Sequence, residues 1–280
     1  MIQISINIFL AIILLGNVFA QQNGICNKAV QIASGNFHSL NLVLKADGSV
    51  WSWTKEKSLP AQFTSISNVK MITVGGALKK DGTVWTLGEE SPKQVAGLSE
   101  ITMLAEGSHS LALKNDGTVW AWGRNNHGQL GDGTTTDRSS PIQVSGISNI
   151  TMIAAKAFHS LALKDDGTVW AWGKNYFGQL GDGTRTDRTF PVQVNGLFNI
   201  VTLTTGDYHS LALKDDGTVW AWGNNFFGAL GNDTYKASTS TIPVQVIGLS
   251  NVSTLVAGSS SVGSFSLALK KKWYCLGMGM

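Results

Sequence analysis

The amino-acid sequence contains one phrase of fifteen residues three times, and this repetition limits the possible folds more than any other feature. The copies are His109–Gly123, His159–Gly173 and His209–Gly223, which differ only in the residue before the aspartate of an Asp-Gly pair. Weaker copies run from His38 to Trp53 and from Ala77 to Gly88. The Asp-Gly pairs recur after 34, 35, 50 and 50 residues, at Asp47, Asp81, Asp116, Asp166 and Asp216. Repetition at such periods predicts a fold assembled from similar structural units.

Each copy of the phrase predicts a β-hairpin. Side chains alternate through His109–Lys114 and again through Thr118–Gly123, and a period of two residues is typical of strands. Between these runs, Asn115–Gly117 supplies residues that tolerate a positive φ, which is a hairpin signal. Two further short strands are expected beside each hairpin, for example at 141–144 and 150–155. Each long unit therefore contains four strands and shows no helical period.

The fold class expected from these units is all-β, a β-propeller of four-stranded blades. A sheet that is buried on both faces needs a neighbour on each side, and radial repetition provides one. We expect the tryptophan face of one blade to pack on the Ser/Ala face of the next. We also expect this chain to contain only part of a larger ring, because the ring has been truncated. The alternative is a closed ring of five or six blades. The repeats define five complete units and half of a sixth, with the complete ones at roughly 28–66, 68–98, 100–148, 149–198 and 199–250.

Composition supports a large buried core and excludes several classes of function. Hydrophobic residues make up 43% of the 280 residues and charged residues only 14%, which fits neither a disordered chain nor a charged coiled coil. The ten tryptophans need a buried environment. The net charge of +3 is too small and too dispersed to indicate binding to nucleic acid. Two cysteines, Cys26 and Cys275, define no disulfide framework.

The first twenty residues have the properties of a signal peptide. Met1–Ala20 carries no charged side chain, and Ile8–Leu15 is an unbroken apolar run. Val18 and Ala20 occupy the third and first positions before the predicted cleavage site, which lies between Ala20 and Gln21. The apolar run is shorter than the roughly 20 residues that a membrane span needs. The sequence therefore predicts a signal peptide over 1–20, a propeller over 21–270, a secreted or cell-envelope location, and no membrane span in the mature chain.

The repeat phrase and the loop that follows it resemble a known family. HSLALKDDGTVWAWG, followed by the glycine-rich Asn175–Thr184, is similar to the repeat of the regulator of chromosome condensation family, and the resemblance covers roughly residues 28–270. It implies a propeller. The first two units lack the glycine-rich loop and resemble secreted bacterial members, some of which bind other proteins. The family's exchange-factor activity toward a small GTPase is not expected, because the predicted signal peptide places the chain outside the cytosol.

The last ten residues depart from the repeat. Phe265–Lys270 begins a sixth copy, but no Asp-Gly hairpin follows it. Codons that encode Lys272–Gly279 can be chosen so that a reading frame shifted by one base encodes Asn-Gly-Thr-Val-Trp-Ala-Trp-Gly, which is the repeat phrase. We therefore interpret 271–280 as an out-of-frame tail. The gene sequence tests this interpretation, because the alternative frame should continue with further repeats.

The recurring polar residues are expected to have structural roles. Four histidines each stand beside a serine, at His38, His109, His159 and His209. A catalytic triad needs one asymmetric constellation, and histidines one blade apart are too distant to share a metal ion, so we expect structural hydrogen bonds. Two acidic segments, Asp132–Asp137 and Asp182–Asp187, lack the terminal glutamate of a calcium-binding loop. We therefore expect these segments to form turns rather than calcium sites. The sequence thus predicts no catalytic residue, no metal and no cofactor.

Positions that differ between the repeats are better candidates for binding. The glycine-rich loops carry aromatic rings or an imidazole at equivalent positions, and arginines further along. Aromatic residues and arginine often anchor protein interfaces. The alternative is that the aromatic side chains cover the blade below them. The candidate binding residues are His127, Tyr176, Phe177, Phe226, Phe227, Arg138 and Arg188.

The functional prediction is a secreted β-propeller that binds a protein or a cell-surface ligand without catalysis. One alternative is a hydrolase or lyase with its site on one rim of the ring. That alternative needs clustered acidic or histidine residues that break the repeat, and the sequence has few of them. The other alternative is a truncated fragment of a larger surface adhesion protein.

Overall fold

The computed structural model describes residues 28–34, 41–54, 59–87, 91–233, 239–260 and 263–270. Every helix or strand element in these ranges is a strand, which confirms the all-β prediction. The described part of the chain contains no helix that could cross a membrane. Four predictions from the sequence lie outside the described residues, and they concern the signal peptide at 1–20, Cys26, His38 and the out-of-frame tail at 271–280.

The strands form five four-stranded antiparallel sheets and one two-stranded sheet, called blades 1 to 6 in chain order. Blade 1 contains β1 (Ala29–Ser34), β2 (Asn41–Lys45), β3 (Val50–Trp53) and β4 (Ala61–Gln62). Blade 2 contains β5 (Val69–Ile72), β6 (Gly76–Lys79), β7 (Val84–Thr86) and β8 (Lys93–Gln94). Blade 3 contains β9 (Ile101–Glu106), β10 (His109–Lys114), β11 (Val119–Gly123) and β12 (Arg138–Gln143).

Blades 4 to 6 continue the same order of strands. Blade 4 contains β13 (Ile150–Lys156), β14 (His159–Lys164), β15 (Val169–Gly173) and β16 (Arg188–Gln193). Blade 5 contains β17 (Ile200–Thr205), β18 (His209–Lys214), β19 (Val219–Asn224) and β20 (Thr239–Gln245). Blade 6 contains β21 (Val252–Ser260) and β22 (Gly263–Lys270).

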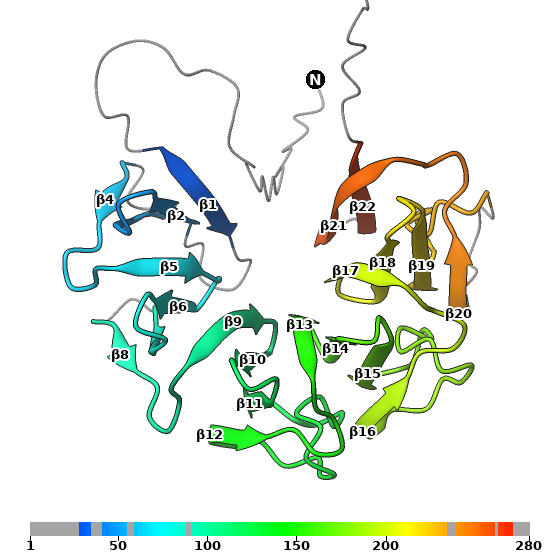
Figure 1. Cartoon of the computed structure of the whole chain (residues 1–280), viewed down its shortest axis with the longest axis horizontal. Coiled ribbons are helices and arrows are strands. Elements are labelled where there is room, and N and C mark those ends of the chain that lie inside the picture. The colour runs from blue at the N-terminus through cyan, green and yellow to red at the C-terminus, as the bar shows by residue number, and fades with distance from the viewer. Residues whose placement is uncertain are drawn as a thin grey trace, which may run out of the picture.

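The blades follow one another around a central axis, as predicted for a propeller (Figure 1). In each complete blade the first strand lies nearest the axis and the fourth lies at the rim. The described blades form an arc that begins at blade 1 and ends at β21 and β22. The strand predicted at 150–155 is the innermost strand of blade 4, so it belongs to the hairpin that follows it in sequence.

The Asp-Gly hairpins are stabilised by hydrogen bonds within the turn, and they lie against the segment that leads into the next blade. At the tip of the β10–β11 hairpin, Asp116 Oδ1 accepts hydrogen bonds from the backbone amide and the hydroxyl of Thr118, at 3.0 and 2.6 Å. Gly117 has a φ of +79°, and a Cβ atom there would lie 3.1 Å from the Cα of Asn149. Glycine is required at this position because the left-handed conformation and the close approach both disfavour a side chain.

The tryptophans share a face of the blade with the small residues, so the predicted pairing of faces is wrong. Ser110 of β10 is paired with Trp122 of β11. Residues directly opposite each other in an antiparallel pair point to the same side of the sheet. The tryptophan face of each blade therefore packs on the leucine face of the preceding blade. At the junction of blades 3 and 4, Trp172 shares one buried apolar cluster with Leu111 and Leu113.

Every pair of consecutive blades in the described part of the chain has its own apolar cluster, built from the leucine face of one blade and the first strand of the next. Tryptophans of the following blade belong to the clusters at the four junctions from blade 1 to blade 5, whereas the described cluster between blades 5 and 6 contains none. Trp172 and Trp222 are fully buried at the junctions where the preceding blade carries a long glycine-rich loop. Trp122 follows blade 2, in which the connection from β7 to β8 is short, and it is only half-buried.

Candidate functional site

The long loops between the third and fourth strands are folded around a buried asparagine. In blade 4, Asn175 Nδ2 donates hydrogen bonds to Asp182 Oδ1 and to the carbonyl oxygen of Thr186, both at 3.1 Å. Its Oδ1 accepts a hydrogen bond from the amide of Leu180 at 3.0 Å. Asn125 makes the equivalent bonds in blade 3. Because a buried amide must be paired, this network fixes the loop before any partner binds.

Arg138 and Arg188, which the sequence suggested as binding residues, form ion pairs inside these loops. Arg138 Nη2 lies 2.7 Å from Asp132 Oδ2, and Arg188 Nη2 lies 2.7 Å from Asp182 Oδ2. Burial disfavours the ionised form of Asp132, but hydrogen bonds from Thr134 and Arg138 outweigh it and hold the pKa of Asp132 below 3.8. The carboxylates are therefore engaged within the loop. Among the described residues, no group of three or more His, Cys, Asp or Glu could hold a metal ion.

Each long loop also fastens its own blade to the next one. The carbonyl oxygen of Gln129 in blade 3 accepts hydrogen bonds from Trp172 Nε1 at 2.8 Å and from the Ser160 hydroxyl at 2.9 Å. The amide of Gly133 donates to the carbonyl oxygen of Thr189 on the outer strand of blade 4, at 3.0 Å. The loop of blade 4 makes the same three bonds to blade 5. The glycine-rich sequence thus has a structural function.

The repeated histidines are part of the same junctions. Each ring is buried and its Nε2 lies within hydrogen-bond distance of a serine of the next blade, at 2.6, 3.0 and 3.1 Å for His109–Ser160, His159–Ser210 and His209–Ser266. Because the serine hydroxyl donates to a carbonyl oxygen, the histidine must donate. Burial lowers the pKa of the three rings to about 4, 3 and 4. These contacts confirm the predicted structural hydrogen bonds for the described histidines.

The variable positions of the long loops bring an aromatic cluster together across the junction of blades 4 and 5. Phe177 is at its centre, and its ring centroid lies 4.9 Å from Tyr176, 5.2 Å from Tyr208 and 5.7 Å from Phe226, all in edge-on orientations. One blade earlier, His127 contacts Phe158 with ring centroids 5.4 Å apart. We call Tyr176, Phe177, Tyr208 and Phe226 the aromatic cluster.

The structure divides these aromatic residues into a half-buried ring that covers the blade junction and rings that are exposed to solvent. Phe177 is half-buried and covers the junction between its own blade and the next. Tyr176 is 67% exposed, and Phe226 and Phe227 are 42% and 61% exposed. Adjacent exposed rings of this kind are typical of interaction surfaces.

Two aromatic residues of this region were not among the candidates from the sequence. Phe158 and Tyr208 lie in the turns between the first and second strands of blades 4 and 5. The sequence marks both of them at the position immediately before the repeated histidine. This position holds Ser108 in blade 3 and an aromatic residue in each of the next two blades. Comparison of the repeats at that position would have identified them.

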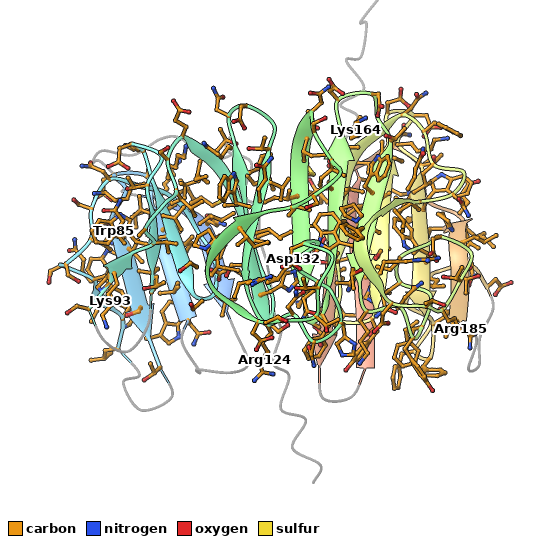
Figure 2. All side chains as sticks on the ribbon, turned by 90° about the horizontal axis from the view of Figure 1, so that it is seen from below. Trp85, Lys93, Arg124, Asp132, Lys164 and Arg185 are labelled. Carbon is orange, nitrogen blue, oxygen red and sulfur yellow. The ribbon has the colours of Figure 1, made fainter. Side chains whose placement is uncertain are left out.

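The aromatic cluster lies at the end of the propeller opposite the Asp-Gly hairpins. Figure 2 shows Arg124 and Arg185, which belong to the long loops, at one end of the blades and Lys164, which precedes a hairpin, at the other. Arg124 and Arg185 are exposed, and Lys174 lies 5.3 Å from the ring centroid of Phe158. The loop face therefore combines aromatic side chains with cations. The carboxylate of Asp187 on this face is paired with His127, with 2.7 Å between Asp187 Oδ2 and His127 Nδ1.

Sequence comparison finds one matching family profile and distant curated relatives. The profile of the RCC1-like domain matches residues 16–280. The E3 ubiquitin-protein ligases HERC2 of Homo sapiens and Mus musculus are each 28% identical over 165 residues, which covers 46% of this chain. The match covers only 3% of the length of either ligase.

Several solved structures have a similar fold. Prp20p of Saccharomyces cerevisiae, studied with its binding to Gsp1p and histones, has a TM-score of 0.74 at 20% identity, over 86% of this chain and 68% of that chain. Human WBSCR16 has a TM-score of 0.73 at 20% identity, over 84% and 71%. A structure of Kap60 bound to yeast RCC1 (Prp20) gives 0.72 at 24% identity, over 87% and 68%. At these identities the similarity concerns the fold alone.

Proposed function

Because this chain belongs to the family of RCC1-like domains, we propose that it is a binding scaffold without catalytic activity that recognises a partner protein through its loop face. RCC1-like propellers commonly mediate protein interactions. Prp20p binds Gsp1p and histones, and Kap60 binds yeast RCC1 (Prp20). These relatives support protein binding as a class of function, and the partner of this chain has to be inferred from its own surface.

The observation that carries the proposal is the aromatic cluster, with Tyr176 and Phe226 exposed beside half-buried Phe177. Rigid aromatic side chains gain a large buried area at little cost in conformational entropy. The network around Asn175 holds the loop in place, so little additional ordering is needed on binding. Arg124 and Arg185 at the same end of the blades favour a partner that carries acidic groups near its apolar side chains (Figure 2).

The binding experiment compares two exposed faces of the same protein. The variant Tyr176→Ala/Phe227→Ala removes exposed rings from the loop face, and Phe198→Ala removes a 59% exposed ring from a linker beside the Asp-Gly hairpins. Pull-down of cell-envelope proteins by the purified propeller should lose its specific partners with the double variant and keep them with Phe198→Ala. Retention of the same partners by the double variant would contradict the role of the loop face.

We infer further that the protein acts outside the cytoplasm, either secreted or in the cell envelope. The support is the uncharged, apolar Met1–Ala20, which has the composition of a signal peptide. Protein recovered from its native cells should therefore begin at Gln21. Terminal sequencing by mass spectrometry measures this directly, and a mature protein that retains Met1–Ala20 would contradict the inference.

A further inference from the structure

Blade 6 presents an open strand edge among the described residues. Phe265–Lys270 of β22 repeats the sequence of the second strand of a complete blade, and β21 pairs with it on one side. In complete blades the other side of this strand pairs with the tryptophan strand. Leu267 and Leu269 are 47% and 59% exposed, whereas the equivalent leucines of blade 3 are 0% and 4% exposed. The proposal below concerns this edge and uses none of the rings of the aromatic cluster, so it does not depend on the proposed function.

The junction of blades 4 and 5 shows what a tryptophan strand contacts when it is present. Trp222 Nε1 donates to the carbonyl oxygen of Gln179 at 2.8 Å. The indole also packs against Gly181, where a Cβ atom would lie 2.9 Å from Nε1. Trp172 makes the same contacts with the loop of blade 3. The seat of the indole therefore consists of a carbonyl oxygen, a glycine and the apolar residues around them.

At the junction of blades 5 and 6 the same carbonyl oxygen and glycine are present, and no indole of the described residues packs against them. The carbonyl oxygen of Ala229 accepts a hydrogen bond from Ser266 at 2.8 Å, and Ser266 also lies 3.1 Å from His209 Nε2. Among the described residues, the three atoms nearest to a Cβ atom at Gly231 would all belong to Val246, at 2.8, 3.9 and 4.0 Å. Gly231 is exposed, whereas the equivalent Gly181 is buried.

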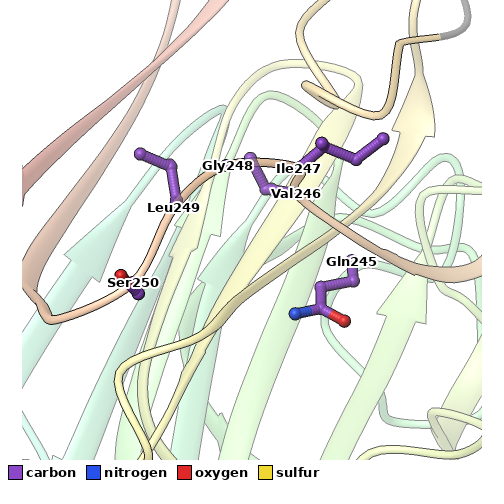
Figure 3. Close-up of a pocket in the computed structure, with 6 residues that line it drawn as sticks. All are labelled: Gln245, Val246, Ile247, Gly248, Leu249 and Ser250. Atoms are coloured by element: carbon purple, nitrogen blue, oxygen red, sulfur yellow. The ribbon is translucent and has the colours of Figure 1, made fainter.

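A pocket lies at the same position on blade 5. It has a volume of about 420 Å³ and is lined by the segment from Gln245 to Ser250 (Figure 3). Val246 and Leu249, which line it, are half-buried. The equivalent Val194 and Leu197 of blade 4 are 1% and 0% exposed and share a cluster with the tryptophans of blade 5. The pocket is therefore located where the tryptophans of a sixth blade would pack.

We propose that this edge binds an extended segment of the type Val-Trp-Ala-Trp-Gly, supplied by a partner chain, as the third strand of blade 6. The repeat defines the register, because the residue pairs of β10 and β11 include Leu113–Val119, Ala112–Trp120 and Ser110–Trp122. In β22 the equivalent positions are Leu269, Ala268 and Ser266. Strand addition then provides backbone hydrogen bonds, and the second indole donates to the Ala229 carbonyl oxygen.

The test uses the full chain and a fluorescently labelled peptide with the sequence of residues 215–224, DDGTVWAWGN. The control peptide carries alanine in place of both tryptophans. Fluorescence anisotropy should show saturable binding of the first peptide that is at least about tenfold tighter than that of the control. Val246→Glu, which places a charge in the pocket, should abolish binding, whereas Ile242→Glu on the same strand region should not.

Several outcomes would overturn the proposal. Equal binding of the two peptides, or binding of neither, would show that the indole seat does not select the strand. Binding that appears only after deletion of residues 271–280 would assign the seat to the chain's own tail. A dimer in sedimentation experiments that the peptide fails to dissociate would assign the edge to a second copy of the chain.

A second experiment places the tryptophan strand in the same chain, so its result does not depend on the affinity of a free peptide. Residues 271–280 are replaced by the sequence of residues 215–224, and the matched control has alanine at both tryptophan positions. The first variant should have a melting temperature several degrees above the control, because it fills the seat on blade 5. It should also no longer bind the free peptide. Equal melting temperatures would contradict the proposal.

Discussion

Replacement of Trp172 by alanine is expected to lower the free energy of unfolding by about 4 kcal/mol. The indole is 0% exposed, shares a buried cluster with Leu111 and Leu113, and donates to the Gln129 carbonyl oxygen at 2.8 Å. Its removal leaves a cavity at the junction of blades 3 and 4 and loosens the loop of blade 3 that fastens the two. Urea denaturation at neutral pH measures the effect.

Two other positions provide a graded comparison. Trp122→Ala should have a smaller effect, because Trp122 is half-buried at a junction where the preceding connection is short. His127→Ala should have the smallest effect of the three, because His127 lies on the surface of a loop and contacts Asp187 and the ring of Phe158. If Trp172→Ala were no more destabilising than His127→Ala, the tryptophans would not be the main contacts between blades.

Acidification below pH 6.5 is expected to destabilise the protein well before its carboxylates are protonated. The pKa values of His109, His159 and His209 are lowered to about 4, 3 and 4 by burial, whereas the same rings titrate near 6.5 in the unfolded chain. Between these values the unfolded chain binds more protons than the folded one. The free energy of unfolding therefore falls as the pH falls, by up to about 1.4 kcal/mol per pH unit for each ring.

A single variant tests the origin of this pH dependence. Thermal and urea unfolding between pH 7.5 and 5 isolates the histidines, because most carboxylates titrate below this range. Glu106 acts in the opposite direction, because burial raises its pKa. His159→Gln retains a donor for Ser210 and removes one titrating ring, so its stability should fall less steeply with decreasing pH. A slope equal to that of the unchanged protein would show that another group controls the acid sensitivity.

Much of the fold could be predicted because the repeat makes its signals local. The alternation in His109–Lys114 and the Asp-Gly pair after it indicate strands and a hairpin from neighbouring residues alone. The face on which Trp122 lies could not be predicted in the same way. It depends on the pairing with Ser110, and a shift of one residue in register moves every side chain to the opposite face.

The candidate site was predicted less completely for a related reason. Tyr176, Phe177 and Phe226 stand out because they vary between repeats, but their contact with Tyr208 depends on how blade 4 packs on blade 5. The same sequence comparison suggested Arg138 as a binding residue, and in the structure its guanidinium is paired with Asp132 inside the loop. Variation between repeats identifies surface loops. It does not show which of their side chains form contacts within the loop and which are available to a partner.

By itself, the sequence determined the strands, the hairpins, the number of blades in the described chain and the assignment of the repeated histidines to structural hydrogen bonds. These features depend on residue order within one repeat. Only the tertiary structure decided which faces pack together, which aromatic rings meet at the loop face, and that no indole of the described residues packs beside Ala229 and Gly231. Those features depend on contacts between residues about one repeat apart, and the radial packing of the blades sets these contacts.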